Sequence, residues 1–175
     1  MNRLSVSLDD DSFAILKKYH TKYPTSQAEI IRKALRTFDA IENATERISV
    51  DYITTYIDLL ADSEHLIVDI AQWKLMFLEI TDGSKKFWEN VYKLGALQQK
   101  KYYDKGLREV KEALTYFEKT NWYRLKEDSK NSYTLIMTVA ESSRFIKTFF
   151  EGFFSKFPQK IQLSEEVMKI RVNIL

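Results

Sequence analysis

The stretch "RLSVSL", residues 3–8, alternates strictly between polar and apolar side chains. One side of it holds Arg3, Ser5 and Ser7, and the other side holds Leu4, Val6 and Leu8. This alternation predicts a half-buried β-strand. A single short strand leaves its backbone donors and acceptors unpaired, so it needs a partner strand.

Two helical segments follow this strand within the first 40 residues. Residues 9–24, "DDDSFAILKKYHTKYP", begin with capping oxygens, continue with apolar residues at helical spacing and end at Pro24. Residues 25–38, "TSQAEIIRKALRTF", open with the capping-box pair Ser26 and Glu29. So small a unit cannot bury the apolar strand face alone. We therefore expect a dimer in which two copies of the strand pair antiparallel above four helices.

Residues 3–38 resemble the ribbon-helix-helix family of DNA-binding transcriptional regulators, which includes the Arc and methionine repressors. "RLSVSL" resembles the family's strand, and "SQAEIIRKAL" resembles the start of its second helix, commonly S-R-S-E-x-I-R-x-A-[LI]. Gln27 and Ala28 stand where the usual Arg and Ser would be. The resemblance implies a homodimer whose two-stranded ribbon lies in the major groove of double-stranded DNA.

Two sets of DNA contacts are expected from this arrangement. If the apolar side of the strand faces the helices, the base edges are met by Arg3, Ser5 and Ser7. The backbone amides at the start of the second helix form an anion site for a DNA phosphate, at Ser26, Gln27 and Ala28. The alternative for the strand is an ordinary edge strand of one larger domain.

The rest of the chain is predicted as a helical linker, residues 41–61, and an α+β domain, residues 62–175, with helices on an antiparallel sheet. The pattern predicts a buried strand at 64–70, helices at 71–82, 84–106 and 107–121, strands at 122–128 and 132–141, a helix at 142–157, and strands at 160–165 and 166–175. The whole chain is thus α+β, with residues 1–40 forming the ribbon-helix-helix domain.

This order of elements resembles the 4-vinyl-reductase-like small-molecule-binding domain, which is related in fold to vesicle-tethering subunits. The likeness lies in "EHLIVDIAQWKLMF", "LGALQQKKYYDKG" and "FFEGFFSKFPQKIQLSEEVMKIRVNI". It implies a regulatory domain that senses a small ligand or a protein partner. Members of that family often end with a cysteine-bearing metal motif. This chain has no cysteine, so no metal site is implied.

Six aromatic residues are the candidates for lining a ligand pocket: Trp73, Phe77, Trp88, Tyr92, Phe149 and Phe153. The alternative is that these side chains simply form the hydrophobic core. The pairs Phe149–Phe150 and Phe153–Phe154 make a stripe too wide for one packed face. The helix at 142–157 is therefore expected to border the pocket or a dimer contact, and Gly152 would permit a close approach there.

Composition narrows the classes of function. No nucleophile, phosphate-binding or zinc-protease motif is present, and the two histidines, His20 and His65, lack metal-ligand spacing. We expect no enzymatic activity, cofactor or metal. No apolar run resembles a signal peptide or a membrane span, which indicates the cytoplasm. The net charge is only +2, but residues 1–38 hold seven Lys and Arg against four Asp and Glu.

The sequence therefore predicts a homodimeric transcriptional regulator with an N-terminal DNA reader and a C-terminal ligand-sensing domain. The alternative is an antitoxin-type DNA-binding protein whose C-terminal domain binds a partner protein. The length and apolar content of residues 62–175 favour the regulator, because antitoxin tails are usually short and disordered.

Overall fold

The computed structural model describes residues 5–45, 48–63, 65–80 and 83–175. It is an α+β protein whose described residues contain seven α-helices and a four-stranded antiparallel sheet. The chain divides into two compact units, an N-terminal unit at Met1–Thr54 and a C-terminal unit at Thr55–Leu175. Helix α3 (Val50–Ala61) crosses the boundary between them. Within the described ranges, no helix combines the length and apolar character that crossing a bilayer requires.

The N-terminal unit contains helices α1 (Asp10–Lys22) and α2 (Gln27–Thr45). Asp9 caps α1, because its carboxylate accepts a hydrogen bond from the Ser12 amide at 2.8 Å. Tyr23, the residue before Pro24, has extended dihedral angles and ends the helix, as predicted. Helix α2 starts where the Ser26 hydroxyl accepts from the Glu29 amide at 3.2 Å. The Glu29 carboxylate pairs forward with Arg32 at 2.6 Å.

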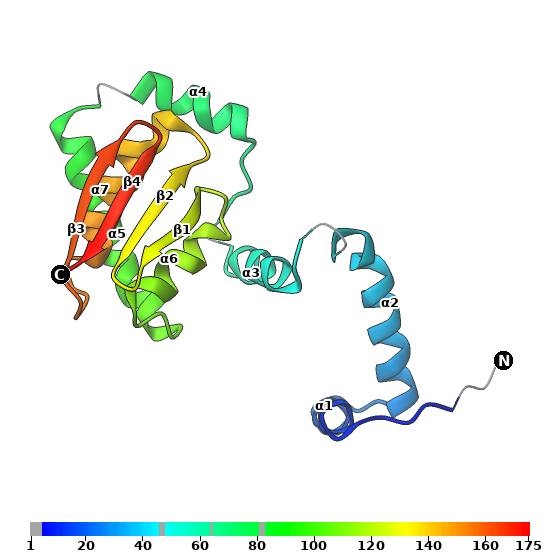
Figure 1. Ribbon diagram of the computed structural model, residues 1–175. Helices are drawn as coiled ribbons and strands as arrows, with labels where there is room; N and C mark the ends of the chain where they lie inside the picture. The colour runs from blue at the N-terminus through cyan, green and yellow to red at the C-terminus, as the bar shows by residue number, and fades with distance from the viewer. Residues whose placement is uncertain (1–4, 46–47, 64, 81–82) are drawn as a thin grey trace. The chain divides into compact units, whose positions relative to one another are not determined.

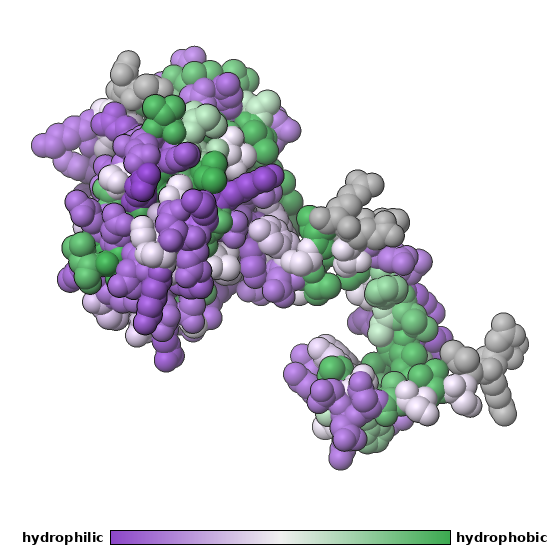
Figure 2. Space-filling view, viewed as in Figure 1, coloured by the Kyte–Doolittle hydropathy of each residue, from purple (hydrophilic) through white to green (hydrophobic). Residues whose placement is uncertain are grey.

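This unit buries little apolar surface within one chain. Among its described residues, Leu16 is the one buried apolar side chain. Leu35 and Phe38 on α2 are 61% and 57% exposed, and Val6 is 67% exposed. Figure 2 shows apolar side chains gathered along α2. Residues 5–9 form no strand in the single chain, so the predicted strand at 3–8 is not confirmed.

The C-terminal unit is built on a sheet with the order β1-β2-β4-β3. Its strands are β1 (Tyr123–Ser129), β2 (Ser132–Met137), β3 (Ile161–Glu166) and β4 (Lys169–Ile174). The register places Leu135 on β2 opposite Leu125 on β1 and Ile170 on β4. All four strands, and their antiparallel pairing, match the sequence prediction. Figure 2 shows that the open face of the sheet is mostly hydrophilic.

The other face of the sheet is covered by helices (Figure 1). These are α5 (Lys85–Asp104), α6 (Val110–Glu118) and α7 (Ser143–Phe154), which follows a short 3-10 turn at Ala140–Ser142. Helix α6 starts later than predicted because Glu109 and Glu112 form a reciprocal capping box around Val110. The buried core joins these helices to the inward side chains of β1, β2 and β4, such as Tyr123, Leu135 and Val172.

Helices α5 and α7 lie unusually close, because each presents a glycine to the other. A Cβ atom on Gly95 would lie 2.1 Å from the Phe149 carbonyl oxygen, and one on Gly152 would lie 1.9 Å from the Tyr92 carbonyl oxygen. The close approach expected at Gly152 is therefore made by α5 of the same chain. The wide stripe on α7 meets two surfaces within the unit. Phe153 contacts Tyr102 of α5, and Phe150 contacts Tyr123 of β1.

The strand predicted at residues 64–70 is wrong. Residues 65–69 have no regular secondary structure, and residue 64 lies outside the described residues. Helix α4 (Ile70–Ile80) begins directly after Asp69, whose carboxylate accepts a hydrogen bond from the Ala71 amide at 2.8 Å. The apolar run Leu66–Val68 has high strand propensity, but the described sheet consists of the four strands β1, β2, β3 and β4, and this run is not part of it.

Candidate functional sites

The predicted base-contacting residues belong to the N-terminal segment. Arg3 lies outside the described residues, as do residues 1, 2 and 4. Ser5 and Ser7 are exposed in a segment without regular secondary structure. The structure contains one chain, so the pairing of this segment with a second copy stays a prediction.

The predicted phosphate site lies at the start of α2, where Ser26, Gln27 and Ala28 are all exposed. The amides of the first helical turn have no acceptor within their own helix, and they point along its axis toward solvent. They therefore present partial positive charge to an anion. The Ser26 hydroxyl is engaged by the Glu29 amide, so an anion would meet mainly backbone groups.

Lysines surround the turn that leads into α2, a feature that the sequence prediction did not include. The Tyr19 and Tyr23 rings are stacked with centroids 6.2 Å apart. The ammonium groups of Lys22 and Lys33 lie 5.4 and 5.9 Å from the centre of the Tyr23 ring. Neither lysine has an acidic partner among the described residues. This arrangement gathers positive charge beside the start of α2.

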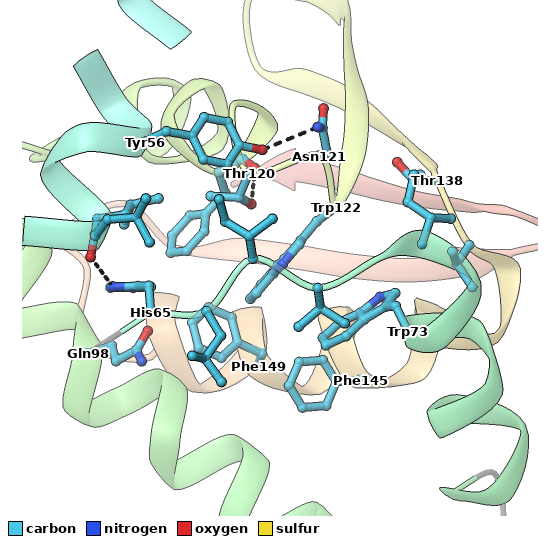
Figure 3. Close-up of a pocket in the computed structure, with 18 of the residues that line it drawn as sticks. Tyr56, His65, Trp73, Gln98, Thr120, Asn121, Trp122, Thr138, Phe145 and Phe149 are labelled. Atoms are coloured by element: carbon cyan, nitrogen blue, oxygen red, sulfur yellow. Dashed lines mark hydrogen bonds between the residues drawn. The ribbon is translucent and has the colours of Figure 1, made fainter. Parts of the chain in front are cut away.

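The C-terminal unit contains a pocket of about 350 Å³ (Figure 3). Six parts of the chain contribute to it: the second half of α3, residues 65–70, α4, α5, the segment from α6 to β1, and the segment from β2 to α7. Helix α6 ends at Glu118, and Asn121 then takes a left-handed conformation with φ 61°. Asparagine tolerates this conformation better than most residues. The turn directs the Trp122 side chain into the pocket.

Aromatic rings form the wall of the pocket. The Trp73 and Trp122 rings lie within 21° of parallel, with centroids 6.5 Å apart. Phe149 meets Trp122 edge-on at 5.3 Å, and Phe145 meets Trp73 edge-on at 6.0 Å. The wall can therefore offer both ring faces and ring edges to a bound molecule.

Of the six predicted pocket residues, two line this pocket and four do not. Trp73 and Phe149 line it. Phe77 packs behind Trp73 at 4.6 Å, and Phe153 is buried in the core. Trp88 packs beneath the Arg144 guanidinium, 4.1 Å from the ring centre, and Tyr92 is exposed beside Gly152. Trp73 and Phe149 therefore line this pocket, and Phe77, Trp88, Tyr92 and Phe153 lie outside its lining. That any of the six contacts a ligand stays a prediction.

Figure 3 shows His65 and Gln98 at the end of the pocket away from Phe145, whereas Thr138 lies on the same side as Trp73. The Asn121 amide donates to the Tyr56 hydroxyl at 3.2 Å. His65 contacts the Leu59 carbonyl oxygen through Nδ1 at 3.0 Å and the Tyr102 hydroxyl through Nε2 at 3.5 Å. A hydrogen on Nδ1 would be donated to the Leu59 carbonyl oxygen. No element of the sequence pattern indicated Asn121 or His65 as pocket residues.

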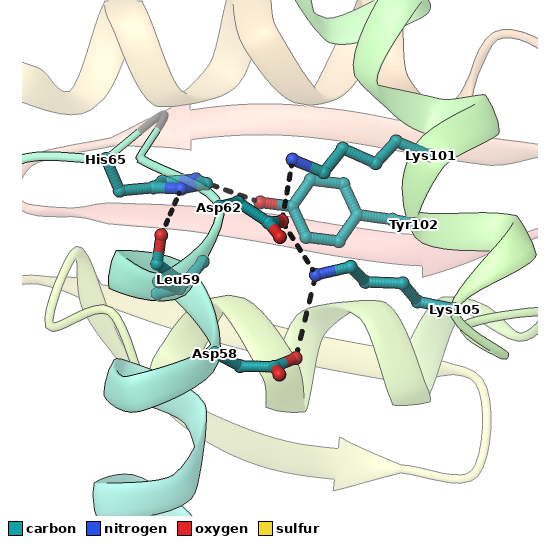
Figure 4. Close-up of polar contacts among 7 residues, drawn as sticks. All are labelled: Asp58, Leu59, Asp62, His65, Lys101, Tyr102 and Lys105. Carbon is teal, nitrogen blue, oxygen red and sulfur yellow. Dashed lines mark hydrogen bonds and ion pairs between the residues drawn. The ribbon is translucent and has the colours of Figure 1, made fainter.

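An ion-pair cluster holds the end of α3 against α5 (Figure 4). The Asp62 carboxylate lies 3.1 Å from the Lys101 ammonium and 3.3 Å from the Lys105 ammonium, and Asp58 lies 3.6 Å from Lys105. Hydrogen bonds from Lys101 and Lys105 lower the pKa of Asp62 from its ordinary value. Exposed pairs contribute little one by one, but this network of four charges positions the α3 wall of the pocket.

Among the residues that the structure describes, no group of three or more His, Cys, Asp or Glu side chains is placed to hold a metal ion. Comparison with known proteins finds no family model, no curated protein and no solved structure that matches this sequence.

Proposed function

We propose that this protein is a homodimeric, sequence-specific DNA-binding regulator of transcription, acting in the cytoplasm. Its N-terminal unit forms a ribbon-helix-helix dimer that reads the major groove. Its C-terminal unit senses a ligand through the pocket.

The observation that carries the proposal is the exposed apolar surface of the N-terminal unit. In the single chain, Val6, Leu8, Leu35 and Phe38 are all at least 42% exposed, and one apolar side chain of the described unit is buried. A folded unit of this size does not stay stable with so small a core. A second copy that pairs residues 3–8 and packs against α2 would bury these side chains.

The charges of this unit also support DNA as the ligand. Lys22 and Lys33 lie against the Tyr23 ring beside the turn before α2, and Ser26, Gln27 and Ala28 at the helix start are exposed. A phosphate at the helix start would meet both the amides and the lysines. Because phosphate contacts add affinity without reading sequence, base readout is assigned to Arg3, Ser5 and Ser7.

Selection of DNA fragments from a random pool, using the purified full chain, tests the proposal directly. We expect a two-fold symmetric site bound by a dimer, with both half-sites protected in footprinting. A folded monomer at micromolar concentration, measured by light scattering, would contradict it. Stable co-purification with a second protein that the chain inhibits would instead favour the antitoxin-type alternative.

Replacing Arg3 with alanine is expected to cost about 1–3 kcal/mol of binding free energy on the selected site and to relax base preference at one position in each half-site. Lys33→Ala is the matched control for loss of one positive charge. It should weaken binding by the same factor on all DNA sequences. It should also reduce the slope of log affinity against log salt concentration by about one, because one phosphate contact is lost. Anisotropy titrations on matched and mismatched sites distinguish these effects. If Arg3→Ala keeps full base preference, the strand is not the reader.

A further inference from the structure

We infer that the pocket in the C-terminal unit binds an uncharged aromatic molecule. Only the role of this molecule rests on the proposed function: in a DNA-binding regulator, it would be the effector. The binding itself is argued from the pocket alone.

The described lining of the pocket indicates the charge of the ligand. Among the described residues, no Asp, Glu, Lys or Arg lines the pocket, and its one histidine, His65, contacts the Leu59 carbonyl oxygen and the Tyr102 hydroxyl. The nearby charges of Asp58, Asp62, Lys101 and Lys105 are paired with one another. A charged ligand would lose hydration in this pocket without gaining an opposite charge, which is costly. An uncharged apolar molecule instead gains about 25 cal/mol for each Å² that it removes from water.

The arrangement of the aromatic rings in the pocket wall indicates the chemical class of the ligand. The nearly parallel rings of Trp73 and Trp122, with Phe149 edge-on to Trp122, offer planar faces and edges at one end of the pocket. Aromatic pairs that stack with an offset or meet edge to face gain more than the burial of their apolar area alone, and an aliphatic chain has no ring with which to make that additional contact. The volume of about 350 Å³ is at the small end of the range for ligand pockets, which suits one small fused-ring molecule.

At its polar end, the pocket can form hydrogen bonds with one polar substituent of the ligand. Gln98, on α5, lines the pocket, and its side-chain amide has no hydrogen-bond partner among the described residues. Its carbonyl oxygen can accept from an N–H or O–H group on the ligand, and its NH₂ group can donate. The ligand is therefore an aromatic molecule with a polar but uncharged group on one side.

Residues 65–69 form the wall that is open to solvent. Leu66 and Ile67 line the pocket and are still 89% and 71% exposed. A ligand that lies against them would remove their apolar surface from water. The same two side chains could instead fill the pocket themselves, and the experiment below distinguishes this outcome from ligand binding.

Two fluorescent probes with the same ring skeleton test the inference on the full chain without DNA. N-phenyl-1-naphthylamine is uncharged, and 8-anilino-1-naphthalenesulfonate is the same molecule with an added sulfonate. We expect saturable binding of the uncharged probe, with quenching of tryptophan emission. We expect the sulfonate to bind at least about tenfold more weakly, because its charge must be desolvated.

Two leucines on α5 supply a matched pair of variants. Leu94 lines the pocket, whereas Leu97, one turn further along the same helix, does not. Both are exposed, at 42% and 75%, so a charge at either position should leave the fold intact. Leu94→Glu should weaken binding of the uncharged probe by at least about tenfold, and Leu97→Glu should change it less than about twofold.

Equal effects of the two substitutions, equal affinity for the two probes, or no binding of the uncharged probe would each overturn the inference. None of these outcomes bears on the DNA-binding part of the proposed function, because DNA binding by the wild-type chain is measured separately. Conversely, tight binding of the uncharged probe with no selected DNA site would leave the pocket assignment standing and remove the proposed function.

Discussion

Replacing Val6 with aspartate is expected to abolish dimerisation and DNA binding together while leaving the C-terminal unit folded. In the proposed ribbon, Val6 lies on the strand side that packs against the helices of both copies. A carboxylate there would be buried without a partner, which costs several kcal/mol. Without the second copy, Leu16 is the one buried apolar side chain among the described residues of this unit, so a chain that cannot dimerise has little stability in its N-terminal unit.

Light scattering and tryptophan fluorescence measure the two parts of this result separately. All three tryptophans, Trp73, Trp88 and Trp122, belong to the C-terminal unit, so their emission during urea unfolding reports that unit alone. We expect a monomeric mass with an unchanged fluorescence transition for Val6→Asp.

Ser5→Asp places the same charge on the opposite side of the predicted strand and serves as the control. It should preserve the dimer and weaken DNA binding, because the carboxylate would face the phosphate backbone. A Val6→Asp protein that remains a dimer and still binds the selected site would exclude the ribbon arrangement.

Most of the C-terminal fold could be predicted from the sequence because its elements have strong local signals. Helix α5 is a long periodic segment that begins directly after the capping residue Ser84, and β1 and β2 flank a polar turn. The error at residues 64–70 has a different origin. A segment with strand propensity forms a strand only where the tertiary fold places it along the edge of a sheet, and residues 65–69 pair with neither edge strand, β1 or β3.

The pocket was only partly predictable, because its wall comes from six separate parts of the chain. Trp73 and Phe149 could be selected as large aromatics on predicted helices. Trp122 could not, because its position depends on the left-handed turn at Asn121. Phe153 has the same residue type and helical spacing as Phe149, yet it lies in the core. Which of the two meets a cavity is decided by the crossing of α5 and α7, which no local period encodes.

The second large effect is expected at the crossing of α5 and α7, where alanine would replace Gly95 or Gly152. Helix propensity alone predicts that alanine at either position stabilises a helix by about 1 kcal/mol relative to glycine. Packing predicts the opposite result, because the new methyl group would overlap a backbone carbonyl oxygen at 2.1 or 1.9 Å. A backbone oxygen cannot move aside as a flexible side chain can, so the two helices must separate by roughly 1 Å and lose contacts along their length.

We expect packing to dominate and each of Gly95→Ala and Gly152→Ala to destabilise the C-terminal unit by about 3 kcal/mol, the upper part of the range for overpacking. Urea unfolding followed by tryptophan fluorescence measures the change. Gly106→Ala is the control, since its φ of 99° is unfavourable for alanine but no atom lies within 4 Å of the added methyl group. That substitution should cost only about 1 kcal/mol.

The double variant gives the sharper test of the mechanism. Gly95 and Gly152 lie at one crossing, so separating the helices to admit the first methyl group also makes room for the second. The destabilisation by both substitutions together should therefore be smaller than the sum of the single effects, by more than the roughly 0.5 kcal/mol within which distant sites add. Additive losses would mean that the two glycines act independently, and a stabilising Gly95→Ala would mean that α5 and α7 do not pack backbone against backbone.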